Sequence, residues 1–342
     1  MGGSASNGVS KSLRTRIRRT LAAWDLAVDS MDLVAWKKQQ QAGVWRVETK
    51  SGTRCVKLSS RPLDRCRFTA DAHEHLTARG ARVPALYRTL TGEPFAQVGE
   101  QALSVTQWID LQEAPNDVDG ARALSAGLGA FHRLGSEFTP SAEARFHTRL
   151  GQWATTYATS QQKAYQLART WRGRCDQESL LRSLLDRLCR QADSAVQSLQ
   201  SSGYHALAAK GERYWGLVHR DPSWTNIQVG PDGVYLIDLD SVVFDLPVSD
   251  LGLFMHETLD RRGRWDSDWV AAMLDGYREA YPLEPELFDL LLIELARPTM
   301  LYKRLRKLLK KSGAEASEES LLRLLALDHT RWKALSALGL EL

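Results

Sequence analysis

Hydrophobic and polar positions follow two different periods along the chain, and the change between them divides the sequence. Within residues 11–24, leucine, isoleucine and tryptophan recur at helical spacing, which predicts one amphipathic helix. From about residue 34 to 109, apolar and polar positions alternate instead. The alternation is clearest in residues 44–48 and 54–58, which flank a Lys-Ser-Gly turn and therefore predict a β-hairpin.

The rest of this first half contains one more helix and three more strands. Residues 62–79 have a proline near their start and Gly80 just beyond their end, the punctuation expected of a helix. The alternating pattern then predicts strands over residues 85–90, 94–98 and 103–108. The first half is therefore predicted to be a sheet with one covering helix.

Helical periodicity dominates beyond a linker at residues 111–120, which is rich in Asp, Pro and Gly. The sequence predicts helices over 121–134, over about 142–199 as one long helix or a pair, and from 249 onward. A single β-rich island at 214–243 interrupts them. The expected fold is α+β and bilobal, with a small β-rich N-lobe and a larger helical C-lobe.

This layout predicts three domains of unequal size. Residues 1–30 would form an N-terminal tail and helix, residues 31–109 a nucleotide-binding N-lobe, and residues 110–342 a helical C-lobe that carries the catalytic loop and the acceptor site. A chain of 342 residues is long enough for two lobes that share a cleft.

Composition and charge narrow the class of protein. The 45 basic and 41 acidic residues leave a net charge of +4, too small to indicate nucleic acid binding. The four cysteines match no zinc-binding spacing, which favours reduced thiols. No segment approaches the roughly 18 apolar residues of a membrane helix, and the N-terminal apolar stretch is too interrupted for a signal peptide. We expect a cytoplasmic protein without a membrane or nucleic acid partner.

The strongest chemical signal is the segment His219-Arg220-Asp221, with Asn226 five residues after the aspartate and Asp238 at the end of a later apolar strand. This spacing is that of the catalytic loop of kinases. Phosphoryl transfer needs an oriented acceptor hydroxyl and cations around the transferring phosphate. The pattern predicts Asp221 as the catalytic base, and Asn226 and Asp238 as ligands of Mg²⁺, which favours sparse carboxylate and amide ligation.

With these residues the sequence resembles the aminoglycoside phosphotransferase and choline kinase superfamily, whose fold is protein-kinase-like, and within it the bacterial spore coat protein S family. The resemblance extends from about residue 30 to the C-terminus. Besides the catalytic loop it rests on the segments 44–47, 80–84, 107–109, 128–132 and 237–252. It implies an ATP- and Mg²⁺-dependent phosphotransferase that acts on the hydroxyl of a small molecule. It also makes spore coat proteins further candidate partners, and the spore coat a second candidate location.

The resemblance also assigns roles in the N-lobe. Lys57 would grip the nucleotide phosphates, with Glu74 as its ion-pair partner, although Glu48 is another conceivable partner. The loop before Gly43 would cover the phosphates, but it offers a single glycine where the family loop has more. The hinge that meets the adenine edge would consist of Gln107, Trp108 and Ile109.

Two residues around the catalytic loop have further expected roles. Asp250 resembles the aspartate that braces this loop, or it is a helix N-cap. Arg220 stands where small-molecule phosphotransferases usually carry glycine. Only 12 residues separate Asp238 from Asp250, which leaves no phosphorylatable activation segment.

Other candidate residues have plainer interpretations. His73 and His75, two residues apart, point to different sides of a helix and do not form a metal pair. His132 ends an apolar run and is expected to be a hydrogen-bonded structural residue. The basic residues between 303 and 311 form a solvated helix face or an anchoring patch for an acidic substrate or the spore surface.

Two alternative functions stay open. One is a structural or assembly protein of the spore coat that keeps the fold but has weak or no catalysis. The single glycine in the predicted phosphate-covering loop, Gly43, favours this alternative. The other is a protein kinase that uses coat proteins as acceptors, and the short segment after Asp238 argues against it.

Overall fold

The computed structural model describes residues 9–171, 178–209, 214–310 and 317–340. They fold into two compact units, each built from several stretches of chain. The first contains the described residues up to 112 together with 137–147 and 228–242. The second contains the described residues of 113–136, 148–227 and 243–342. The first unit holds the large sheet and the second holds most of the helices, so the expected α+β class is confirmed.

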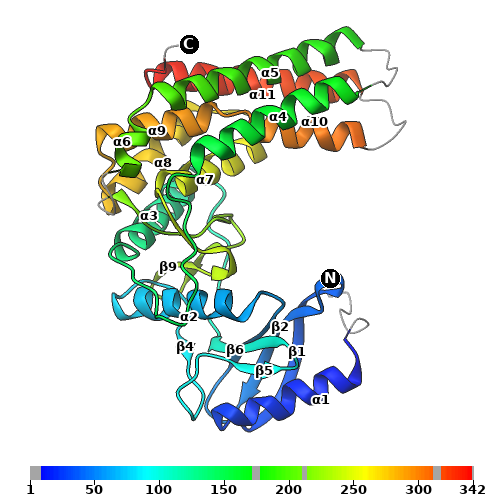
Figure 1. The fold of residues 1–342 in the computed structure, drawn as a ribbon, viewed down its shortest axis with the longest axis vertical. Coiled ribbons are helices and arrows are strands. Elements are labelled where there is room, and N and C mark those ends of the chain that lie inside the picture. Colours follow the sequence, from blue (N-terminus) through cyan, green and yellow to red (C-terminus); the bar gives the residue numbers. More distant parts are fainter. Residues whose placement is uncertain (1–8, 172–177, 210–213, 311–316, 341–342) are drawn as a thin grey trace. The chain divides into compact units, whose positions relative to one another are not determined.

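One antiparallel sheet organises the first unit, drawn blue to cyan in Figure 1. Its strands run in the order β1-β2-β3-β6-β4, and β5 pairs with β6. Their bounds are β1 Val28–Lys37, β2 Ala42–Thr49, β3 Arg54–Ser59, β4 Leu86–Tyr87, β5 Ala96–Val98 and β6 Gln101–Gln107. The predicted hairpin is β2–β3. The periodicity gave no strand over most of β1, whose outer face is exposed.

The predicted amphipathic helix is α1, Lys11–Thr20, continued by a 3₁₀ turn over Leu21–Trp24. Ser10 caps it, because its hydroxyl accepts a hydrogen bond from the Leu13 amide at 3.2 Å. Leu13 and Ile17 are buried against Trp45 of the sheet and the apolar residues around it. The helical spacing seen in the sequence is therefore the face that packs on the sheet.

Helix α2, Leu63–Ala78, and a second hairpin complete the first unit. The helix ends before Gly80, whose φ of +81° lies in the left-handed region where glycine is favoured. The hairpin consists of β8, Ile227–Gly230, and β9, Gly233–Leu236. The Leu236 amide donates a hydrogen bond to the Arg82 carbonyl at 3.0 Å. This bond fixes the strand that leads into Asp238.

Helices form most of the second unit. They are α3 Val118–Leu134, α4 Trp153–Thr170, α5 Glu178–Ser201, α6 Tyr204–Ala209, α7 Val248–Arg262, α8 Ser267–Ala280, α9 Pro285–Ala296, α10 Thr299–Lys310 and α11 Glu318–Ala337. A short antiparallel pair, β7 Gly216–Val218 and β10 Val243–Asp245, brackets the catalytic loop. Helices α3 and α8 approach closely at Gly276. A Cβ atom at this position would lie 2.2 Å from the Arg122 carbonyl oxygen, so the close approach requires glycine.

The expected long helix or pair over 142–199 is a pair, but it begins later than predicted. Helix α4 starts only at Trp153, and α5 follows it. Residues 137–147 belong instead to the first unit, where Phe138 packs edge-on against Phe68 at 5.3 Å. Helices α4, α5, α10 and α11 lie side by side (Figure 1) and share one apolar core. Within the described residues, no helix is both long and apolar enough to span a membrane.

Arg331 of α11 holds three helices together. Its Nη1 group donates to the carbonyls of Leu295, Ala296 and Arg297 at 3.1–3.3 Å, which satisfies the C-terminal end of α9. Its Nη2 group donates to Asp328 at 2.7 Å and to Gln191 of α5 at 2.8 Å. The side chain is 5% exposed, so these groups have little access to water as a substitute partner.

We expect Arg331→Met to lower the free energy of unfolding by about 3–5 kcal/mol, because it leaves buried acceptors unpaired. Urea denaturation followed by circular dichroism measures the change. The exposed Arg323→Met on the same helix is the matched control and should leave the stability nearly unchanged. Equal effects of the two substitutions would contradict the assignment of Arg331 as the residue that joins these helices.

Candidate active site

Lys57 lies in the middle of β3, between Val44 of β2 and Ser104 of β6. Its ammonium group is 2.5 Å from Asp238 Oδ1 and 2.8 Å from Asp240 Oδ1. The structure therefore joins two residues that the sequence analysis placed at one site, Lys57 and Asp238, although 181 residues separate them.

The negative charges of the two aspartates change the pKa of Lys57. Burial alone would lower this pKa, but the carboxylates of Asp240 and Asp238 outweigh burial and raise it above its ordinary value. Lys57 is therefore a permanently charged ammonium group at neutral pH, which is what a phosphate-binding residue requires.

The expected ion pair between Lys57 and Glu74 is not formed. Glu74 instead pairs with Arg88, through two short contacts of 2.6 and 2.7 Å. The reason is the placement of α2. Its first turn faces the Asp240 end of the cluster, since Arg65 donates to the Asp240 carbonyl at 3.0 Å. Glu74 lies nine residues further on, about 14 Å along the helix axis.

Gly43 lies within β2 rather than in a flexible loop. A Cβ at this position would lie 2.7 Å from the Trp36 ring and 2.9 Å from the Ala35 carbonyl oxygen of β1. Strand packing is thus sufficient reason for the glycine. The connection before it is a 3₁₀ turn, Lys38–Gln40. A role of Gly43 toward nucleotide stays a prediction.

The predicted hinge follows the end of β6. Gln107 is the last residue of the strand, and its amide donates to the Ala85 carbonyl at 2.8 Å. Trp108 and Ile109 are half-buried, and Trp108 directly follows the Arg54–Gln107 pair that ends the β3–β6 ladder. The role of these residues as an adenine-binding hinge stays a prediction.

In the second unit the catalytic loop is held by Asp250. This residue is fully buried in the first turn of α7, and its carboxylate accepts the amides of His219 at 2.5 Å and Arg220 at 2.9 Å. The helix begins at Val248, with Pro247 at the cap position, so Asp250 is not the N-cap. The bracing role expected from the resemblance is confirmed.

His132 supports the same carboxylate from α3. Its Nε2 atom lies 3.2 Å from Asp250 Oδ2, and its Nδ1 atom lies 2.8 Å from the Tyr277 hydroxyl. Burial alone would raise the pKa of Asp250, but the hydrogen bond and charge of His132, with His219 and Arg220, hold it below its ordinary value. His132 is thus the hydrogen-bonded structural histidine that the sequence predicted.

Asp221 and Asn226 lie together at the loop itself. The Asn226 amide nitrogen donates to the Asp221 carbonyl at 2.9 Å and to its Oδ2 atom at 3.1 Å. This pair of bonds orients the amide, and Asn226 Oδ1 has no hydrogen bond to another described residue. An amide oxygen presented in this way is a suitable metal ligand.

Arg220 has a φ of +69° in the left-handed region. This conformation supplies a physical reason why the family usually carries glycine there. Its guanidinium lies 3.8 Å from the buried carboxylate of Asp245 in β10. Asp238 is likewise left-handed, with a φ of +62°. Backbone strain of this kind gathers at functional sites.

Two carboxylates that contact predicted residues, one in each unit, were outside the predicted set. Asp240 is the second aspartate of the Ile-Asp-Leu-Asp segment, and its spacing of two from Asp238 was the available signal. Asp245 lies in an apolar strand with no motif around it. Its Oδ1 atom accepts the Trp153 indole N–H at 2.9 Å. Sequence reasoning had no means of finding that contact.

The α+β fold, the lysine paired with the Asp238 segment and the braced His-Arg-Asp loop define a kinase-like phosphotransferase. Residues 37–287, well over half of the chain, match the model of the phosphotransferase enzyme family. The chain belongs to this family.

Named relatives agree with this assignment. The chain is 23% identical over 273 residues to spore coat protein S of Bacillus subtilis (strain 168). The matched region covers 78% of each of the two chains. Its fold is similar to an aminoglycoside phosphotransferase from Alicyclobacillus acidocaldarius (TM-score 0.74, 17% identity, 94% of each chain). It is also similar to the amicoumacin kinase hAmiN, solved with AMP-PNP, Ca²⁺ and Ami (TM-score 0.60, 13% identity, 96% of each chain). The resemblance stated from the sequence is confirmed.

Asp245 gives the site a pH-dependent stability. Burial raises its pKa from 3.8 to about 6, although Arg220 and Trp153 act in the opposite direction. The folded state therefore binds this proton more tightly than the unfolded state. The resulting stabilisation is complete below the unfolded pKa and is lost as the pH rises through about 6.

We expect the stability difference between the wild type and Asp245→Asn to fall by about 2.5 kcal/mol between pH 4 and pH 7. Urea denaturation at a series of pH values measures it. The exposed Asp268→Asn serves as control and should give a difference that hardly changes with pH. A pH-independent difference for Asp245→Asn would show that its carboxyl group titrates normally.

Proposed function

We propose that the protein is an ATP- and Mg²⁺-dependent phosphotransferase that acts on a hydroxyl group of a small molecule. The observation that carries the proposal is the ion-pair cluster of Lys57, Asp238 and Asp240 in a member of the phosphotransferase enzyme family. A cation already lies between two converging carboxylates there. The same arrangement suits a divalent metal ion and the phosphates that accompany it.

The residues of the catalytic loop would act on the acceptor. Asp221 would orient the acceptor hydroxyl and take its proton as the oxygen attacks the γ-phosphorus of ATP. The bond from that phosphorus to the β–γ bridging oxygen breaks, and ADP leaves. Asn226, through its bonds to Asp221, would keep the base in position.

Asp238 and Asn226 would hold Mg²⁺, and Lys57 would grip the α- and β-phosphates. The metal ion supplies neutralisation of the charge on the transferring phosphoryl group. Support for nucleotide and divalent metal use comes from the amicoumacin kinase, which was solved with AMP-PNP and Ca²⁺. Gln107, Trp108, Ile109 and Gly43 are assigned to the nucleotide on the resemblance alone. Glu74 is assigned on the same ground, and its pairing with Arg88 speaks against it.

The second candidate function is a structural or assembly protein of the spore coat with weak or no catalysis. The similarity to spore coat protein S favours it. We propose the cytoplasm as the location for the enzyme and the spore coat for the second candidate. Spore coat proteins would then be the partners. The intact set of Asp221, Asn226 and Asp238 ranks the enzyme first.

We expect Asp221→Asn to lower turnover by roughly 10²–10⁴-fold, because the amide cannot accept the hydroxyl proton. An ATP-consumption screen against alcohols, amino alcohols and sugars measures it. Stabilisation by ATP should persist in this variant, since Asp221 is not assigned to the nucleotide. Unchanged turnover would exclude Asp221 as the base.

We expect Asp238→Asn to abolish the Mg²⁺-dependent rise in melting temperature that ATP produces in the wild type. At a ligand concentration 100 times the dissociation constant, that rise corresponds to about 2.7 kcal/mol. Asp232→Asn, in the turn of the same hairpin, should keep the full rise. A wild type that shows no rise at all would favour the structural candidate instead.

A further inference from the structure

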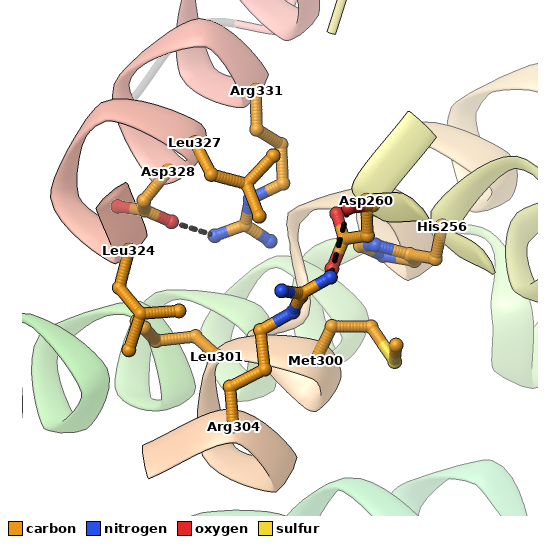
Figure 2. A pocket seen from close by; sticks show the side chains of 9 residues that line it. All are labelled: His256, Asp260, Met300, Leu301, Arg304, Leu324, Leu327, Asp328 and Arg331. Carbon is orange, nitrogen blue, oxygen red and sulfur yellow. Dashed lines mark hydrogen bonds and ion pairs between the residues drawn. The ribbon is translucent and has the colours of Figure 1, made fainter. Parts of the chain in front are cut away.

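Two arginines are buried within the part of the chain that the structure describes, Arg65 of α2 and Arg331 of α11. Their partners differ in kind. Arg331 forms an ion pair with the carboxylate of Asp328, which Figure 2 shows. Arg65 is 6% exposed, and no carboxylate of a described residue lies within ion-pair distance of its guanidinium group. Its hydrogen-bond acceptors are two backbone carbonyls instead, those of Asp240 and Val242.

The stability of the first unit does not explain why an arginine stands at this position. A buried charge without an ion pair destabilises a fold. The Nη1 group of Arg65 is also buried and has no hydrogen-bond partner among the described residues. Burial, and then the charge of Arg61, lower the pKa of Arg65 to about 10, so the side chain remains charged at neutral pH. An apolar side chain would pack on the Phe68 ring, whose centroid lies 5.2 Å from Cζ of Arg65, without these costs.

The two carbonyls that Arg65 binds belong to the turn that directly follows Asp238. Leu239–Ser241 form a 3₁₀ turn, and the Val242 amide donates to the Leu239 carbonyl at 3.0 Å. The Nη2 group of Arg65 donates to the Asp240 carbonyl within this turn at 3.0 Å, and to the Val242 carbonyl just after it. One donor group thus bridges two carbonyls and fixes residues 238–242, the metal turn, against the first turn of α2.

The metal turn has a conformation that needs such support. Asp238 has a φ of +62°, and a left-handed aspartate persists only where the surrounding structure holds it. The carboxylates of Asp238 and Asp240 must also converge, as their contacts of 2.5 and 2.8 Å to the Lys57 ammonium show. A metal site requires ligand positions within about 0.5 Å. A backbone bond to Arg82 fixes the strand that enters the turn, and Arg65 fixes its exit.

We propose that Arg65 is a positioning residue of the phosphotransferase, which holds the metal turn in the conformation that binds Mg²⁺ through the carbonyls of Asp240 and Val242. The inference rests on the proposed function, since that function assigns the metal to Asp238. Arg65 acts through the backbone of the turn and not on the acceptor. Its loss should therefore change the affinity for the metal ion and leave the role of Asp221 intact.

The first test needs neither metal nor nucleotide. Hydrogen exchange of the full chain, followed by mass spectrometry, compares peptides that cover residues 238–242 with peptides that cover β3. Arg65→Met keeps an unbranched side chain against Phe68 but removes every donor. We expect it to accelerate exchange in the metal turn at least about tenfold relative to β3. Unchanged relative exchange in the turn would overturn the proposal.

The second test separates metal affinity from stability. At saturating ATP, the Mg²⁺ concentration that gives half of the rise in melting temperature is compared between wild type and variants. Arg65→Met should increase this concentration at least about tenfold, because the carboxylates of the turn are no longer held together. Arg65→Lys, which keeps the charge and a donor group, should recover part of the difference. A purely structural arginine would lower the melting temperature of the free protein without changing the Mg²⁺ requirement.

Two control variants lie on the same helix. Arg67→Met makes the same substitution at an arginine that pairs with Glu93 at 2.8 Å and does not bind the turn. Leu76→Ala removes a fully buried side chain and lowers stability by another route. Both should keep the wild-type Mg²⁺ requirement and the wild-type relative exchange of the turn. An equal increase of the Mg²⁺ requirement in Leu76→Ala would overturn the proposal.

The outcomes distinguish this inference from the function on which it rests. A wild type without any Mg²⁺-dependent rise would overturn the proposed function and, with it, the metal part of the inference. A normal rise in the wild type together with an unchanged Mg²⁺ requirement in Arg65→Met would overturn the positioning role alone.

Discussion

The two hydrogen bonds from the His219 and Arg220 amides to the buried Asp250 carboxylate are the constraint on which the catalytic loop depends. Arg220 adopts a left-handed conformation that costs about 1–3 kcal/mol. Each hydrogen bond to a buried charge contributes about 1.5–3 kcal/mol, so the pair can hold this conformation in place. His132 and Tyr277 extend the same network to α3 and α8. The helical unit therefore determines the backbone from which Asp221 projects.

Much of the fold was predictable because its signals are local. The β2–β3 hairpin, α1 and α2 were each predicted from signals within some 20 residues. These signals are the hydrophobic periodicity of the segment and, for the hairpin and α2, the turn residues, glycine or proline at its ends. Strand β1 was largely missed, since register shifts between Val28 and Ser30 and between Leu33 and Ala35 interrupt its alternation of more and less buried positions. Helix α4 starts later than expected because residues 137–147 contain Phe138, which packs against Phe68 of α2. Helical periodicity does not reveal such a distant partner.

The candidate site also has residues that the sequence revealed and contacts that it did not. Asp221, Asn226 and Asp238 could be named from spacing, because the loop and hairpin that carry them are continuous in sequence. The partner of Lys57 could not, since Glu48, Glu74, Asp238 and Asp240 lie on different elements, and only the tertiary structure determines which of them approaches β3. Arg65 of α2 binds the carbonyls of Asp240 and Val242, which connects this helix to the segment that pairs with Lys57.

The pairing of Lys57 has a consequence for how the site accepts a ligand. Asp238 and Asp240 repel each other, and the ammonium of Lys57, which contacts both, offsets that repulsion. A divalent ion bound by Asp238 would neutralise the same carboxylates and leave the lysine free to pair with phosphate. Metal and nucleotide would then favour each other's binding. The metal ion would replace the positive charge of Lys57 at the aspartates, and the phosphates would supply a new negative partner for Lys57. The ion pairs of Lys57 with these aspartates are thus compatible with the role in phosphate binding that we propose for it.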